Sequence, residues 1–100
     1  MNLKISALEY VQEVQNGNIS AEDFVAKTLE HINKVDEQLH AFLSVNEDAL
    51  NQARIIDKKI KSGDKIGSCF GMPISIKDNM CIKNSKTTCG SKMLENYVAP

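Results

Sequence analysis

The sequence predicts an α/β fold, in which N-terminal helices lead into the first strands of a mixed sheet that is incomplete in this chain. Two observations predict this class. Up to Lys61 the apolar residues recur at helical spacing behind capping signals. Beyond Gly63, glycines and a proline punctuate the chain and the apolar residues alternate with a period of two. Helices followed by strands are typical of the opening of an α/β layer structure.

The first helix is expected over about residues 6–16, because Ser6 and Glu9 have the spacing of a capping box. Asn16-Gly17 is the expected stop. The hydrophobic-staple positions hold Ile5 and Tyr10. The expected apolar stripe consists of Leu8, Val11 and Val14.

A second helix is expected over about residues 20–36, where Ser20 and Asp23 repeat the starting signal. Its buried face is expected to consist of Val25, Leu29, Ile32 and Val35. Both histidines, His31 and His40, lie in or just after this helix. We expect them to be surface or capping residues rather than ligands or bases.

Residues 41–45 are rich in strand formers and predict a first short strand. Asn46 is expected to cap a third helix over about residues 47–61. The inward side chains of that helix are expected to be Ala49, Leu50, Ala53 and Ile56.

Residues 73–77 predict a second strand, with two isoleucines on one face and Ser75 and Lys77 on the other. Lys77 ends this apolar strand, so its amine is expected at a sheet edge in a cleft. Burial there disfavours the ammonium form and produces a neutral amine that can act as a general base. An ordinary surface lysine is the plainer alternative. Asp78 and Asn79 are expected to shape the turn that follows.

Composition bounds the chain to one small domain at most. It has 100 residues, of which 42% are hydrophobic, with 12 Lys and Arg against 13 Asp and Glu. These figures exclude collagen-like, disordered and disulfide-scaffold proteins. No apolar run reaches the ~18 residues of a membrane span, and the start lacks the apolar stretch of a signal peptide. A cytoplasmic location is therefore expected.

The cysteines and the lysines have structural interpretations. Cys69, Cys81 and Cys89 have spacings unlike a metal clip and are expected to be reduced and mostly buried. Residues 1–50 carry 3 basic and 9 acidic groups, and residues 51–100 carry 9 and 4. The basic group of the second half includes Lys58, Lys59, Lys61 and Lys65. These lysines predict a solvated face near a helix end, with direct RNA contact as the alternative.

Two segments carry a resemblance to a known family. They are Gly71-Met72-Pro73-Ile74-Ser75-Ile76-Lys77-Asp78-Asn79 and Thr87-Thr88-Cys89-Gly90-Ser91-Lys92-Met93-Leu94-Glu95-Asn96. The first resembles the lysine strand of the amidase-signature family. The second is similar to the tRNA-dependent branch, the A subunits of glutamyl-tRNA(Gln) and aspartyl-tRNA(Asn) amidotransferases. The resemblance covers essentially all 100 residues and implies the N-terminal part of a single amidase-signature domain, truncated at its C-terminus.

The resemblance implies a catalytic role for Lys77. Family members hydrolyse amides with a serine nucleophile, a second serine in a cis peptide, and a lysine that acts as general base or charge relay. Lys77 matches that lysine, whereas the segment that carries both serines is not in this chain. Ser75 lies on the same strand face without a glycine-rich turn, and Ser91 is expected to cap a helix, so neither replaces them. Lining of the pocket by Thr87 and Thr88 is an open alternative.

The resemblance also implies a function and partners. Ammonia released from glutamine would convert Glu-tRNA(Gln) to Gln-tRNA(Gln), with Asp-tRNA(Asn) as a further acceptor. Subunits B and C of a heterotrimer are the implied partners, and a partner subunit uses ATP and Mg²⁺. No cofactor or metal is expected in this chain, and the 100 residues alone are expected to be inactive. Two alternatives are an amidase for another small amide and a non-catalytic helical binding module.

Overall fold

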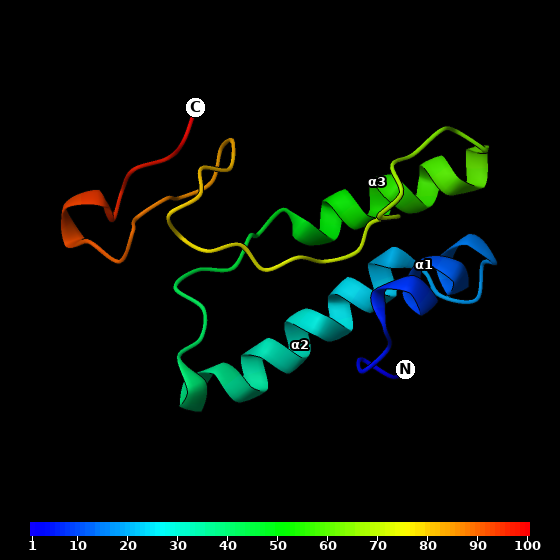
Figure 1. Cartoon of the computed structure of the whole chain (residues 1–100), viewed down its shortest axis with the longest axis horizontal. Coiled ribbons are helices and arrows are strands. Elements are labelled where there is room, and N and C mark those ends of the chain that lie inside the picture. The colour runs from blue at the N-terminus through cyan, green and yellow to red at the C-terminus, as the bar shows by residue number, and fades with distance from the viewer.

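The computed structural model describes residues 1–100 as three helices followed by a C-terminal part built of turns and loops (Figure 1). The elements are α1 (Ala7–Gln15), α2 (Ala21–Leu39), α3 (Ala49–Ser62) and the short 3-10 helix η1 (Lys92–Leu94). Figure 1 shows the chain turning back after α3 and passing between α2 and α3 before it reaches the C-terminal loops. None of the helices combines the length and the apolar character needed to cross a membrane.

The predicted start and stop of α1 are confirmed, but its inward face is not the predicted one. The Glu9 carboxylate accepts the backbone N–H of Ser6 at 3.0 Å, and the Ser6 hydroxyl accepts that of Glu9 at 3.2 Å. Tyr10 and Val14 are buried, whereas Leu8 is 69% exposed. With 3.6 residues per turn, Leu8 lies on the opposite side of the helix from Tyr10. The staple residue Tyr10 is therefore the core anchor, and its ring lies 4.6 Å from that of Phe24.

The start of α2 is also confirmed, since the Ser20 hydroxyl accepts the Asp23 N–H at 3.0 Å. The helix runs three residues beyond the predicted end, to Leu39, and His40 caps it in the left-handed conformation with φ 50°. Val25 is buried, but the rest of the predicted face is only half-buried. The reason is that α3 has 14 residues and α2 has 19, so one end of α2 lies beyond its neighbour.

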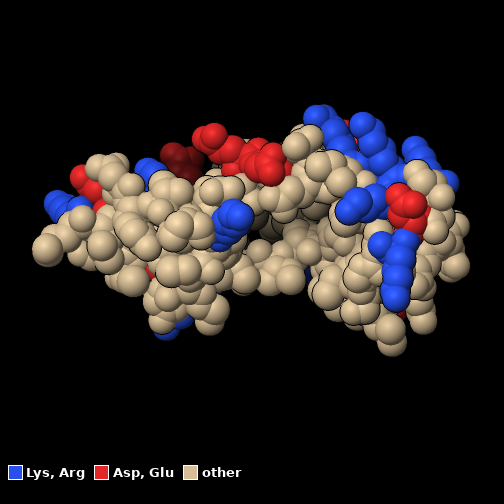
Figure 2. All heavy atoms as spheres, turned by 90° about the horizontal axis from the view of Figure 1, so that it is seen from above, with Lys and Arg blue, Asp and Glu red and all other residues tan.

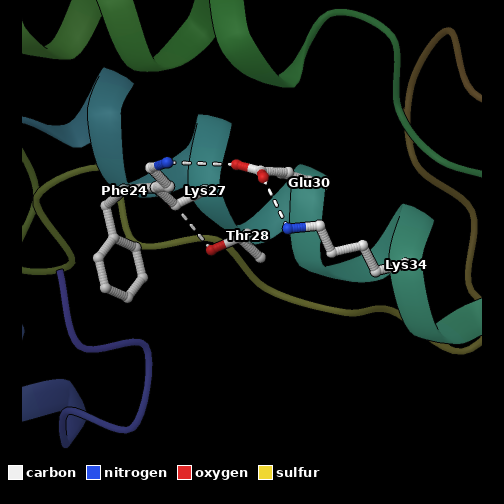
Figure 3. A network of polar contacts seen from close by, with 5 residues as sticks. All are labelled: Phe24, Lys27, Thr28, Glu30 and Lys34. Carbon is white, nitrogen blue, oxygen red and sulfur yellow. Dashed lines mark hydrogen bonds and ion pairs between the residues drawn. The ribbon is translucent and has the colours of Figure 1, made fainter.

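The outer side of α2 is polar (Figure 3). The Glu30 carboxylate pairs with Lys34 at 2.8 Å and with Lys27 at 3.2 Å. These two lysines, Lys34 first, hold the pKa of Glu30 below its usual value. The Thr28 hydroxyl donates to the Phe24 carbonyl at 2.8 Å. The face is therefore satisfied without further partners.

The third helix begins two residues later than predicted. Asp48 is its N-cap and makes no side-chain capping bond. The Asn46 side chain instead accepts the Asp48 N–H at 3.0 Å, and the Asn46 carbonyl accepts the Ala49 N–H at 3.2 Å. Asn46 therefore forms a turn ahead of the helix. The predicted inward face is confirmed, with Ala53 buried and its neighbours packed around it.

Asp57 on α3 caps the start of α2. Its carboxylate accepts the N–H of Ala21 at 2.8 Å and that of Glu22 at 2.9 Å. Arg54, one turn earlier on α3, pairs with Glu22 at 2.7 Å. The carboxylate satisfies two of the amides that the first turn of any helix leaves unpaired. These contacts fix the first turn of α2 against the middle of α3.

The predicted strands are not formed, so only the helical part of the expected fold is confirmed. In the range 41–45, the N–H groups of Ala41 and Phe42 bind the Asp36 carboxylate at 2.7 and 3.3 Å and are not free for a ladder. In the range 73–77 the chain is extended, but no segment pairs with it. A strand requires such a neighbour. One isolated antiparallel bridge, between Lys86 and Val98, is the only strand-like pairing.

Candidate functional site

Lys77 lies at the exposed end of the extended segment 73–77. Its side chain makes no hydrogen bond or ion pair in the structure, and the expected buried position at a sheet edge is wrong for these residues. The Lys77 carbonyl accepts the Met80 N–H at 3.0 Å, which closes a turn over Asp78 and Asn79. The turn prediction is therefore confirmed, and the chemical role of Lys77 stays a prediction.

Asp78 and Thr88 join the two motif segments, and we call this pair the Asp78–Thr88 clamp. One carboxylate oxygen of Asp78 accepts the Thr88 N–H at 3.0 Å, and the other accepts the Thr88 hydroxyl. The Asp78 carbonyl accepts the N–H of Cys89 at 3.0 Å. The Thr88 hydroxyl, followed by its N–H, holds the pKa of Asp78 below its usual value. The carboxylate is thus an ionised acceptor with both oxygens engaged.

The loop that carries Thr88 is fixed from its other side by the C-terminal residues. The Thr87 N–H donates to the Tyr97 carbonyl at 3.1 Å, and the Asn84 N–H donates to the Ala99 carbonyl at 2.8 Å. Thr87 is 4% exposed and its hydroxyl has no partner within the chain. Thr88 is half-buried and engaged in the clamp. Pocket lining by either threonine in a larger protein stays a prediction.

The clamp is the part of the site that the sequence does not indicate. The sequence predicts only a turn for Asp78, and only a place on a pocket wall for Thr88. Their spacing of ten residues follows no helical or strand period, so no local pattern points to the contact. The only available signal is that each lies in one of the two motif segments.

The serines and cysteines complete the surroundings of Lys77. Ser91 caps η1, its hydroxyl accepting the Met93 N–H at 3.3 Å, as predicted for a capping serine. Ser75 is exposed and makes no side-chain hydrogen bond. The three cysteines are free thiols, and all are exposed, so their expected burial is wrong. They lie in turns and loops outside both core clusters.

Lysine and arginine side chains gather over the C-terminal end of α3 in Figure 2. Lys59 and Lys61 lie in its last turn, where cations suit the helix dipole. Lys58 and Lys65 are exposed beside them, and none of the four forms an ion pair. The solvated-face interpretation is consistent with this geometry, and RNA contact stays a prediction.

The beginning of the lysine segment is attached to the helices. Met72 packs against the cluster of Tyr10, Val14 and Phe24. The Tyr10 hydroxyl donates to the Gly71 carbonyl at 3.3 Å. A hollow of about 260 Å³ beside this contact is lined mainly by apolar side chains and does not include Lys77. The segment is therefore held at both ends, by the core near Gly71 and by the clamp at Asp78.

The chain is similar to known proteins along nearly its whole length. Residues 23–100 match the amidase family. The A subunit of glutamyl-tRNA(Gln) amidotransferase from Cenarchaeum symbiosum is 47% identical over 95 residues, which are 95% of this chain and 19% of that protein. The protein of the same name from Prochlorococcus marinus is 46% identical over 90 residues, or 89% and 18%. The first of the numbered A subunits of this amidotransferase from Clostridium acetobutylicum is 40% identical over 98 residues, or 97% and 20%. The chain spans about a fifth of the length of these curated relatives.

Proposed function

The chain belongs to the amidase family, and on that premise we propose that it is the N-terminal part of the glutaminase subunit of a tRNA-dependent amidotransferase. The subunit releases ammonia from glutamine, and the ammonia converts Glu-tRNA(Gln) to Gln-tRNA(Gln). Asp-tRNA(Asn) is a further acceptor to be tested. The observation that carries the proposal is the lysine segment 71–79, which lies inside the family match and in a chain whose relatives bear the amidotransferase name.

Lys77 is proposed as the general base. A neutral lysine amine removes the proton of a second serine, which relays it from the nucleophilic serine, and both serines lie outside this chain. The nucleophile attacks the side-chain amide of glutamine, leaving an acyl-enzyme and releasing ammonia. Lys77 is exposed in the structure, whereas burial is what favours a neutral amine. We therefore propose that residues outside this chain cover it, and that residues 1–100 alone have no amidase activity.

The remaining parts of the complex are also proposed. Subunits B and C are the expected partners, and the misacylated tRNA is the acceptor held by the assembly. ATP and Mg²⁺ are proposed to act on a partner subunit, where the acceptor is amidated. The four lysines near the end of α3 leave a direct contact with tRNA as a secondary expectation.

The test is an assay on the full-length protein, expressed from the complete coding sequence with subunits B and C. We expect ammonia release from glutamine, and formation of Gln-tRNA(Gln) when ATP and Mg²⁺ are present. Lys77→Ala should lower kcat for glutamine hydrolysis by about 100- to 10,000-fold, as loss of a general base does. Lys83→Ala removes another exposed lysine and should leave kcat unchanged.

Three outcomes would contradict the proposal. Hydrolysis of simple amides but not of glutamine, without any effect of the partner subunits, would favour another amidase. Full activity of Lys77→Ala would remove the assigned base. Ammonia release by residues 1–100 that disappears in Lys77→Ala would show that the proposed inactivity of this part is wrong.

A further inference from the structure

We propose that Asp78 and Thr88 are positioning residues for Lys77. The clamp fixes the turn that starts at Lys77 and thereby the direction in which the lysine side chain leaves the backbone. This inference rests on the function proposed above, because it takes Lys77 as the base.

The attachments of the lysine segment support the inference. Between Pro73 and Asn79, backbone groups make only two hydrogen bonds to the rest of the chain. They are accepted by the Lys77 carbonyl, from Met80 at 3.0 Å, and by the Asp78 carbonyl, from Cys89 at 3.0 Å. The only side-chain hydrogen bonds of the segment are those of the Asp78 carboxylate with Thr88. Every polar constraint on the backbone around Lys77 therefore acts within one residue of it.

The clamp also has the form of a rigid support. Both carboxylate oxygens bind the same residue, so rotation of the Asp78 carboxylate would break a bond. The Thr88 hydroxyl is fixed in turn, because it accepts the Gly90 N–H at 3.3 Å while it donates to Asp78. Cys89 and Gly90 have φ of 51° and 68°, which turns the loop around the carboxylate.

Asp78 is suited to orientation rather than to proton transfer. A carboxylate that accepts two hydrogen bonds stays ionised, and its pKa is lowered by those bonds. It has no proton to give at neutral pH and no free oxygen to receive one. Its effect on the reaction therefore passes through the placement of Lys77.

The test uses the full-length protein with its partners and measures kcat and KM for glutamine. Asp78→Asn presents an amide donor to the donors of Thr88, and Thr88→Val removes the hydroxyl at similar volume. We expect kcat to fall by about 100-fold in each, because a misplacement of about 1 Å at a catalytic group has that effect, with KM unchanged. Thr88→Ser keeps the hydroxyl and should restore kcat. The double variant should be no worse than either single variant, and Ser75→Ala should behave as wild type.

The outcomes separate this inference from the proposed function. If Lys77→Ala abolishes hydrolysis while Asp78→Asn and Thr88→Val keep wild-type kcat, the positioning role is wrong and the proposed function stands. If Thr88→Ser is as impaired as Thr88→Val, or if KM changes as much as kcat, the clamp supports the fold and not the lysine. If the wild-type complex releases no ammonia from glutamine, both proposals fall.

Discussion

Replacing Gly71 by alanine is expected to cost much more stability than the same replacement at Gly63. The two glycines have nearly equal backbone angles, φ 74° and φ 71°. A Cβ atom at Gly63 meets nothing within 4 Å, whereas one at Gly71 would lie 3.0 Å from the Cβ of Ala21 and 3.0 Å from the Cγ2 of Ile56. The two variants therefore share the backbone strain and differ only in the close approach to α2 and α3.

The magnitudes follow from these two contributions. A left-handed conformation costs an alanine about 1–2 kcal/mol, and this applies at both positions. Forcing a methyl group into a packed contact adds about 1–3 kcal/mol. At Gly71 this second cost applies because Ala21 is fully buried on a helix and cannot move aside. We expect a loss of about 2–5 kcal/mol for Gly71→Ala, out of the ~5–15 kcal/mol that stabilises a typical domain.

Urea unfolding of residues 1–100, followed by far-UV circular dichroism, measures both losses. The difference of about 1–3 kcal/mol between the variants corresponds to roughly 5–20 °C in melting temperature for a domain of this size. Equal losses for Gly71→Ala and Gly63→Ala would refute the reasoning. That result would mean that the start of the lysine segment does not lie against α2 and α3.

Two further predictions concern Asp57 and Tyr10. Asp57→Ala should lower the free energy of unfolding by about 2–4 kcal/mol, because two helix amides lose a charged acceptor; urea unfolding measures it, and Asp64→Ala, which removes an exposed carboxylate, should change stability by less than about 0.5 kcal/mol. In Tyr97→Phe, Tyr10 is the only tyrosine, and its absorbance should titrate at about pH 12 because burial, and then the charge of Asp57, raise its pKa from 10.0 to about 12. Since the folded pKa lies above the unfolded one, the stability present below pH 10 should be lost as the pH rises to about 12, and titration near 10 would contradict the burial of Tyr10.

The helices were predictable because their signals are local. Ser6 and Ser20 each lie three residues before the amide that they cap, so sequence spacing alone located both starts. The strands failed because pairing needs a neighbour that the pattern of one segment does not contain. The contacts that hold the site together are equally non-local. Asp57 reaches 36 residues back to Ala21, and Asp78 reaches ten residues forward, so neither contact has a sequence period.

The cap that Asp57 places on α2 has a consequence for the order of events during synthesis. The carboxylate is made 36 residues after the Ala21 amide that it binds. At a translation rate of about 5–20 residues per second, the two groups are separated by about 2–7 seconds. During this interval the first turn of α2 has only Ser20 as a cap, and it frays readily because α3 does not yet exist. The growing chain therefore completes the start of its longest helix only after the next helix has been made.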